Sequence, residues 1–247
     1  MTPILQVDSL YGGYLPGKPV LHELSFSIRQ GEMMGLIGLN GAGKSTTIKN
    51  ILGLLKPQKG NIRINGQTLA DAPIPYRAAY AYVPESPELY EELTIREHLE
   101  LTAMAYGLSK DAYLSRSAAL LEEFQMKDKL NSFASHLSKG MKQKVMIMNA
   151  FLIEPSLYII DEPFLGLDPL AIRSLLELMV KMKRKGASFL ISSHILSTIE
   201  KYCDNYVVLH KGHMVAQGDL GELRVQTGLQ HASLDDIFYQ LVQGESL

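Results

Sequence analysis

The stretch that most constrains this chain runs from Gly38 to Thr46 and reads Gly-Leu-Asn-Gly-Ala-Gly-Lys-Ser-Thr. It matches the phosphate-binding pattern G-x-x-x-x-G-K-[ST] at every fixed position. The mostly apolar residues 33–37 before it predict a buried strand, and residues 47–52 after it predict a helix. A strand, a glycine-rich loop and a helix in this order predict an α/β protein with a nucleoside triphosphate site.

The residue types in this loop suit a polyphosphate. Glycines let the backbone wrap closely around an anion, and the N–H groups and the positive end of the following helix stabilise its charge. We expect Lys44 to reach the β- and γ-phosphates and the Ser45 hydroxyl to bind Mg²⁺. A glycine-rich turn with a surface lysine is the alternative interpretation. The predicted nucleotide-binding residues of the loop are Gly38, Asn40, Gly41, Ala42, Gly43, Lys44, Ser45 and Thr46.

Composition limits the class of protein. The chain has 247 residues, 46% of them hydrophobic and 20% charged, which suits a globular domain with a small appendage. Its net charge of -2 gives no field that would attract nucleic acid, so we expect no nucleic-acid partner. Its single cysteine excludes an internal disulfide. No signal peptide or membrane span is predicted, so we expect a cytoplasmic chain.

The patterning predicts how the chain is organised. Short alternating or apolar runs predict strands near both ends, with turns at Asn65-Gly66 and Lys211-Gly212. Between about residues 86 and 155 the apolar spacing becomes helical. We therefore predict an α/β P-loop NTPase core over residues 1–218, with an antiparallel β subdomain and an α-helical insertion at 86–155. Two short helices form an appendage at 219–247.

A second segment supplies carboxylates. Leu157 to Ile160 predict a buried strand that ends in Asp161 and Glu162. Ligands of α/β sheets bind at the carboxyl ends of the strands. We predict that Asp161 binds Mg²⁺ and that Glu162 polarises the attacking water. Two solvated carboxylates at a strand end are the alternative.

Two further segments complete the candidate chemistry. His194 follows the apolar strand 189–191 and can hydrogen-bond the γ-phosphate or the water. Ser138 is predicted to cap a helix whose first turn is basic, with Lys139, Lys142 and Lys144. Basic residues oppose the helix dipole there, so we interpret them as partners of a bound polyphosphate.

With these segments in their order, the chain resembles the nucleotide-binding subunits of ATP-binding-cassette (ABC) transporters over nearly its whole length. Its variants are most similar to bacterial exporter-like subunits of the Ecs-type branch, which pair with separate membrane proteins. The resemblance implies ATP and Mg²⁺ as ligands, with Glu162, His194 and Lys44 as catalytic residues. It assigns the family's other motifs to Leu137–Met141 (signature, with Ser138 and Gly140 binding phosphate), Gly166–Pro169 (D-loop) and Tyr14 (adenine stacking, with Tyr11 as second choice).

The chain departs from the family pattern in three places. Glu85 stands where the family usually has a glutamine; it can still approach Mg²⁺ through an oxygen, but it lacks the amide donor. Lys139 and Met141 replace a glycine and a glutamine of the signature, and Phe164-Leu165 replace a small polar pair before the D-loop.

The resemblance also implies partners. Two copies of the chain would pair head to tail, with ATP between the phosphate loop of one and the signature of the other. The pair would drive a separate integral membrane permease from the cytoplasmic face, for export, with contacts at Glu88-Leu89-Tyr90. A soluble cassette ATPase of DNA repair or translation and a binding-only regulatory module are the alternatives. The cargo is not encoded in these residues.

Overall fold

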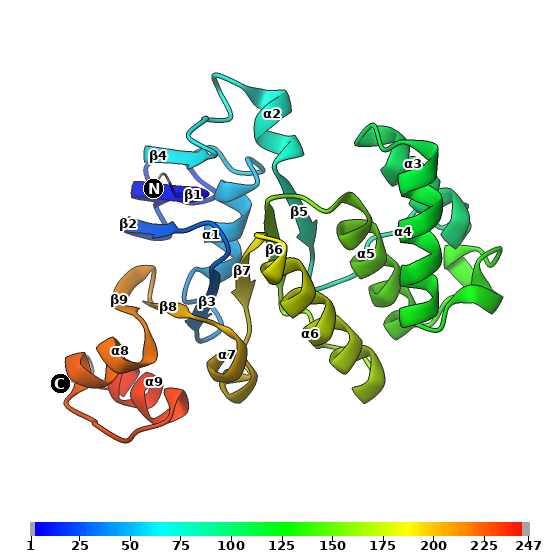
Figure 1. The fold of residues 1–247 in the computed structure, drawn as a ribbon. Helices are drawn as coiled ribbons and strands as arrows, with labels where there is room; N and C mark the ends of the chain where they lie inside the picture. Colours follow the sequence, from blue (N-terminus) through cyan, green and yellow to red (C-terminus); the bar gives the residue numbers. More distant parts are fainter. Residues whose placement is uncertain (1–2, 244–247) are drawn as a thin grey trace. The chain divides into compact units, whose positions relative to one another are not determined.

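The computed structural model describes residues 3–243 and divides the chain into two compact units. The first unit comprises Met1–Ala79 and Ser188–Leu247, and the second comprises Tyr80–Ala187. Residues 1–2 of the predicted core (1–218) lie outside the described residues. The same holds for residues 244–247 of the predicted appendage (219–247). Figure 1 shows the elements in chain order.

An antiparallel sheet forms one part of the first unit. Its order is β2–β1–β4, with β1 at Leu5–Gly12, β2 at Leu21–Ile28 and β4 at Lys59–Ile64. The register pairs Val7 with Phe26 on one side and with Ile62 on the other. This is the antiparallel β subdomain that the alternating pattern predicts.

A second set of strands in the first unit carries the phosphate loop. Strand β3 (Met33–Gly38) lies between β7 (Ser188–Ser192) and β8 (Asn205–His210), parallel to both. All residues of β3 and β7 are buried, as expected for parallel strands covered on both faces. Strand β9 (His213–Gly218) returns antiparallel to β8 through the predicted Lys211-Gly212 turn.

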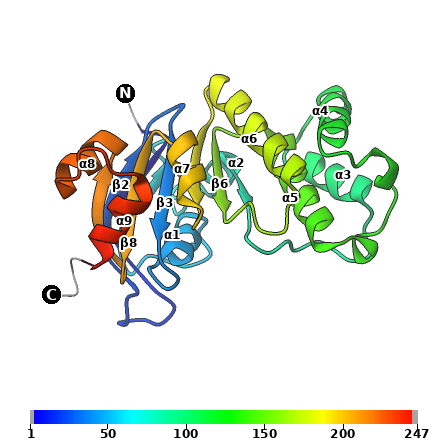
Figure 2. The same ribbon diagram turned by 90° about the horizontal axis from the view of Figure 1, so that it is seen from below.

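The helices of the first unit cover these strands. α1 and α7 both contact β3, while α8 contacts β9 and α9 contacts α7 and α8. Figure 2 shows α8 and α9 beside β8 at the red end of the chain. The bounds are Lys44–Ile51 for α1, Pro73–Ala78 for α2, Leu196–Tyr202 for α7, Leu220–Thr227 for α8 and Leu234–Gln243 for α9.

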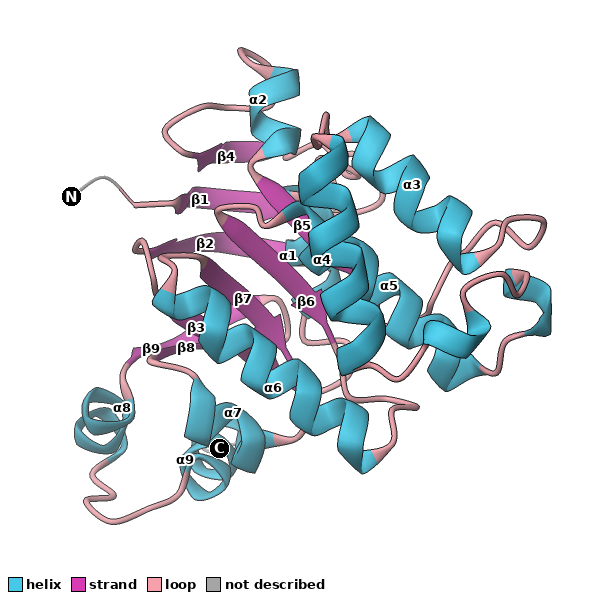
Figure 3. Ribbon diagram, turned by 45° about the vertical axis from the view of Figure 1, so that its right-hand side comes forward, coloured by secondary structure: helices cyan, strands magenta, loops and turns pink. Residues whose placement is uncertain are grey.

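The second unit joins a helical group to a pair of parallel strands. Strand β5 (Tyr80–Val83) pairs with β6 (Leu157–Asp161), and every residue of β6 is buried. Helices α3, α4 and α5 pack on one another, as Figure 3 shows. The helical bounds are Ile95–Ala105 for α3, Lys110–Glu123 for α4, Lys127–Lys129 and Ala134–His136 for the short 3₁₀ turns, Lys139–Ile153 for α5 and Pro169–Arg184 for α6.

The predicted strands at 33–37, 157–160 and 189–191 and the predicted helix at 47–52 are found within a few residues of these bounds. The sequence prediction does not include α2 or α7. Both are short. α2 begins with Pro73, a residue that favours the first helical turn. α7 buries Leu196 and Ile199, which stand three residues apart on one helical face. These signals are present in the sequence but span too few residues to give a period.

Helix α3 begins with a capping box whose loss should be measurable. The Thr94 hydroxyl accepts the Glu97 N–H at 3.2 Å, and the Glu97 carboxylate accepts the Thr94 N–H at 2.7 Å. We expect Thr94→Ala to lower the free energy of unfolding by about 1 kcal/mol, because the cap is lost. Urea unfolding measures this. Thr94→Ser retains the hydroxyl and should unfold like the unsubstituted protein; equal losses in both variants would contradict the capping explanation.

Candidate functional site

The residues predicted to form the site divide between the two units. Tyr14, Gly38–Thr46 and His194 belong to the first unit. Glu85, Ser138, Gly140, Asp161 and Glu162 belong to the second. The chemistry of each group is therefore built up separately.

The phosphate loop links the end of β3 to the start of α1. Gly41 and Gly43 have φ angles of +81° and +111°, a region that favours glycine. A side chain at Gly38 would stand 2.6 Å from the carbonyl oxygen of Leu209, and one at Gly43 would stand 2.6 Å from the Leu21 side chain. Each of these glycines is required by conformation or by space, so the loop has the backbone that an anion nest needs.

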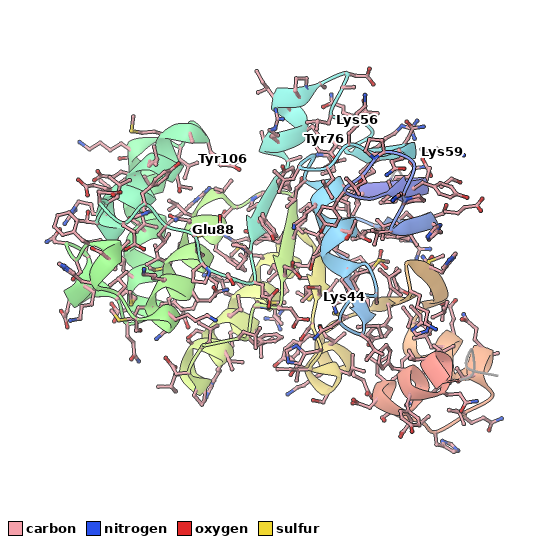
Figure 4. All side chains as sticks on the ribbon, turned by 180° about the vertical axis from the view of Figure 1, so that it is seen from behind. Lys44, Lys56, Lys59, Tyr76, Glu88 and Tyr106 are labelled. Atoms are coloured by element: carbon pink, nitrogen blue, oxygen red, sulfur yellow. The ribbon has the colours of Figure 1, made fainter. Side chains whose placement is uncertain are left out.

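Lys44 lies at the first position of α1, where Figure 4 labels it. Its side chain is buried, and its Nζ donates to the carbonyl oxygens of Gly38 at 2.7 Å and Leu39 at 3.4 Å. An ammonium group has donors only, so phosphate oxygens can take the place of these carbonyls. Ser45 and Thr46 follow in the first turn of α1, next to the positive end of its dipole.

Two tyrosines compete for the role of adenine contact. Tyr14 is exposed, and its ring faces the Nζ of Lys49 on α1 at 5.4 Å from the ring centre. Tyr11 lies on β1, where its hydroxyl donates to Glu23 at 3.3 Å and its ring faces Lys59. Tyr14 therefore lies beside the helix that follows the phosphate loop, whereas Tyr11 contacts β2 and β4. The adenine contact stays a prediction, with Tyr14 as the first choice and Tyr11 as the second.

His194 follows the carboxyl end of β7 and is exposed. Strand β7 is parallel to β3, so both strands present their carboxyl ends at the same edge of the sheet. That edge is where the phosphate loop begins. His194 thus lies at the sheet edge where α/β proteins bind ligands.

The carboxylates of the second unit end strand β6. Asp161 and Glu162 are 4% and 8% exposed, which is unusual for acidic residues. Glu162 has a φ of 47°, a left-handed conformation that is uncommon outside glycine and asparagine. Backbone conformations of this kind gather at functional sites, where surrounding structure maintains them. The alternative of two ordinary solvated carboxylates does not agree with this burial.

Negative charge gathers around the end of β5. Burial, together with the carboxylates of Asp161, Glu88 and Glu85, raises the pKa of the Tyr82 hydroxyl far above its ordinary value. Carboxylate and hydroxyl oxygens are the ligands that Mg²⁺ prefers. The carboxylates of Asp161 and Glu85, both in the second unit, therefore fit Mg²⁺ in chemical type. Among residues 3–243, no group of three or more His, Cys, Asp or Glu side chains could hold a metal by itself.

The signature segment begins α5 and packs on the D-loop. The Ser138 side chain accepts the Met141 N–H at 3.3 Å, which confirms the predicted cap. A side chain at Gly140 would stand 2.5 Å from the carbonyl oxygen of Gly166, closer than a real Cβ contact. Glycine at position 140 is thus required by the backbone of the D-loop.

The basic first half of α5 has carboxylate partners. The Nζ of Lys142 lies 2.7 Å from Glu91, and that of Lys144 lies 2.8 Å from Asp168. A bound polyphosphate is therefore not needed to balance these two charges, in contrast to the interpretation from sequence. The sequence analysis did not predict Glu91 as the partner of Lys142 or Asp168 as the partner of Lys144. Ion pairs between distant segments leave no local pattern in the sequence.

The Lys144–Asp168 pair predicts a pH dependence. The hydrogen bond from Lys144, and then that from the Ala171 N–H, lower the pKa of the Asp168 carboxyl. A lowered pKa adds stability at neutral pH that is lost as the pH falls through the lowered value. We expect Lys144→Gln to raise this pKa, measured by carbon NMR titration, and to cost less than about 1 kcal/mol at neutral pH, since the pair is partly exposed.

The control for this prediction is Lys144→Arg, which keeps the cation. It should leave the pKa of Asp168 low, and the stability difference between the two variants should vanish in acid. A pKa that is unchanged in Lys144→Gln would contradict the assignment.

Comparison with known proteins identifies the family. Residues 21–165 match the family model described as ABC transporter. The chain is 57% identical to the ABC-type transporter ATP-binding protein EcsA of Bacillus subtilis over 243 residues, 98% of each protein. It is 35% identical to the Nod factor export ATP-binding protein I of Burkholderia orbicola, over 86% of this chain and 68% of that protein.

A solved structure agrees with these similarities. The ATP binding subunit of an ABC transporter superposes with a TM-score of 0.94 and 58% identity, over 96% of this chain and 99% of that one. The chain therefore belongs to the ABC transporter family as an ATP-binding subunit, an ATPase that drives transport. The predicted P-loop NTPase fold and the resemblance to the Ecs-type branch are both confirmed. No helix within residues 3–243 is long and apolar enough to cross a membrane.

Proposed function

We propose that this subunit pairs head to tail with a second copy of itself and drives a separate membrane permease, for export, from the cytoplasmic face of the membrane. ABC ATP-binding subunits work with membrane permease components. The relative named as a Nod factor export ATP-binding protein supports the export direction. The chain carries both a phosphate loop and a signature segment, so two copies supply two complete sets, which supports a pair of identical subunits.

The observation that carries the proposal is the backbone of Gly38–Thr46, whose glycines are required by φ angle and space around the buried Lys44. We propose that this loop and Lys44 bind the phosphates of ATP and that Tyr14 stacks on adenine. A stacked aromatic ring is worth about 1–3 kcal/mol per base. Ser138 and Gly140 bind the γ-phosphate held by the partner subunit.

Hydrolysis is assigned to the carboxylates and the histidine. Glu162 accepts a proton from the attacking water, and His194 hydrogen-bonds the γ-phosphate. Asp161, Ser45 and Glu85 would hold Mg²⁺, which neutralises charge that develops on the phosphates. Glu85 offers a carboxylate oxygen as a ligand but has no amide N–H to donate. Any role of Glu85 in sensing the γ-phosphate must therefore use its carboxylate.

The test is to purify the tagged chain from gently solubilised membranes of its own cell, identify what accompanies it and assay vanadate-sensitive ATPase activity. A multi-spanning protein that has no cassette of its own, with activity abolished by Glu162→Gln, is the expected result. ATP that is bound but not turned over, with no membrane protein present, would overturn the proposal in favour of a regulatory module.

A further inference from the structure

We propose that Gly212, in the turn between β8 and β9, is a positioning residue of the phosphate loop: it orients the Gly43 N–H toward the phosphate chain. The inference rests on the proposed role of Gly38–Thr46 in binding ATP. It extends that role to a residue that is far from the loop in sequence but is hydrogen-bonded to Ala42.

Two backbone hydrogen bonds connect the turn to its surroundings. The Gly212 N–H donates to the carbonyl oxygen of Ala42 at 3.0 Å, and the carbonyl oxygen of Gly212 accepts the His22 N–H at 2.9 Å. Gly212 thus bridges the phosphate loop to the beginning of β2. Ala42 is buried, so its carbonyl group has little access to water as a substitute partner.

Because the peptide group is planar, the hydrogen bond to the Ala42 carbonyl also fixes the direction of the Gly43 N–H. The carbonyl of Ala42 and the N–H of Gly43 belong to one planar trans peptide, so they point in opposite directions. Holding the carbonyl on Gly212 therefore points the Gly43 N–H away from the turn. Gly43 precedes the first residue of α1, and its φ of +111° lets the peptide take this orientation. An inward N–H at a helix start is what an anion nest requires.

The turn can make this contact only with glycine. Lys211 and Gly212 have φ angles of 46° and 82°, as expected for a two-residue turn with both central residues left-handed. A side chain at position 212 would stand 1.8 Å from the carbonyl oxygen of Val20. That oxygen belongs to backbone, so the turn itself would have to move, and its N–H would leave Ala42.

Contacts on the outer side hold the turn in place. The rings of His22 and His213 stack with their centres 4.6 Å apart and 9° between their planes. β2 and β9 are therefore in contact beside the turn as well as through it. The Gly212 Cα lies 3.6 Å from where a side chain at Gly43 would begin, so turn and loop pack glycine against glycine.

Substituting Gly212 by alanine in the full chain tests the proposal. We expect the affinity for ADP, measured by calorimetry, to fall roughly 10- to 100-fold, which corresponds to the loss of one hydrogen bond to a charged group. Binding of adenosine, followed by saturation-transfer NMR, should not change, because adenosine has no phosphate. A general loss of stability would affect the binding of ADP and of adenosine alike, so it would not produce this difference.

Gly31→Ala is the matched control. Gly31 has a φ of +75° and no atom within 4 Å of an added side chain, so this variant carries the same backbone strain without the collision. It should lose some thermal stability and bind ADP normally. Wild-type affinity for ADP in Gly212→Ala, or an equal loss for ADP and adenosine, would overturn the inference.

Lys44→Ala separates this inference from the proposed function. If Lys44→Ala binds ADP as tightly as the unsubstituted protein, the phosphate loop itself is wrongly assigned and both fail. If Lys44→Ala loses ADP and Gly212→Ala does not, only the inference fails. Should Gly212→Ala not fold, amide exchange in the unsubstituted protein decides: ADP should slow exchange at Gly212, and an unchanged rate there contradicts the proposal.

Discussion

Replacing Glu162 by glutamine should lower the rate of ATP hydrolysis by roughly 10²- to 10⁴-fold, the range for loss of a general base. Glutamine has nearly the same shape but cannot accept the proton of the attacking water. ATP binding should persist, because the phosphate loop and Lys44 are unchanged. The variant should therefore accumulate as an ATP-bound pair, measured by light scattering with and without ATP alongside phosphate release.

Glu154→Gln is a suitable control for this substitution. Glu154 lies in the same unit and has a similar left-handed φ of 52°, but its carboxylate pairs with Arg116 and Lys185. We expect Glu154→Gln to reduce stability and to leave turnover nearly unchanged. Normal turnover in Glu162→Gln would show that the base is another residue.

Two inactive variants should restore activity when mixed, if the subunits pair head to tail. Lys44→Ala removes the phosphate loop's cation, and Ser138→Asp places a negative charge where the partner's γ-phosphate is proposed to bind. Each variant alone should be inactive. In a mixed pair one site contains both defects and the other contains neither, so equal mixing should return up to about a quarter of the wild-type sites, as symmetry requires.

Ser138→Asp suits this experiment because aspartate caps a helix as well as serine does. The N-cap of α5 is thereby kept, and only the charge changes. Ser109→Asp makes the same exchange at the N-cap of α4 and should be fully active. ATPase activity of the mixtures is the measurement; mixtures as inactive as their components would exclude sites that two subunits share.

Short patterns predicted the local features well. The phosphate loop, the buried strand before Asp161, the cap at Ser138 and the Lys211-Gly212 turn are each set by a few neighbouring residues. Glycines with positive φ, apolar runs and capping side chains act through their own backbone. Such features can be predicted from the sequence because their physical cause lies within one turn or one strand.

Contacts between distant segments were decided by the tertiary structure. The pairing of Lys144 with Asp168, the fit of Gly140 against Gly166 and the bond from Gly212 to Ala42 each join segments that share no local pattern. Sequence alone determined that this chain has a phosphate loop and acidic residues after a buried strand. Only packing decided which backbone groups orient them, because a hydrogen bond or a close approach depends on where the chain returns in space.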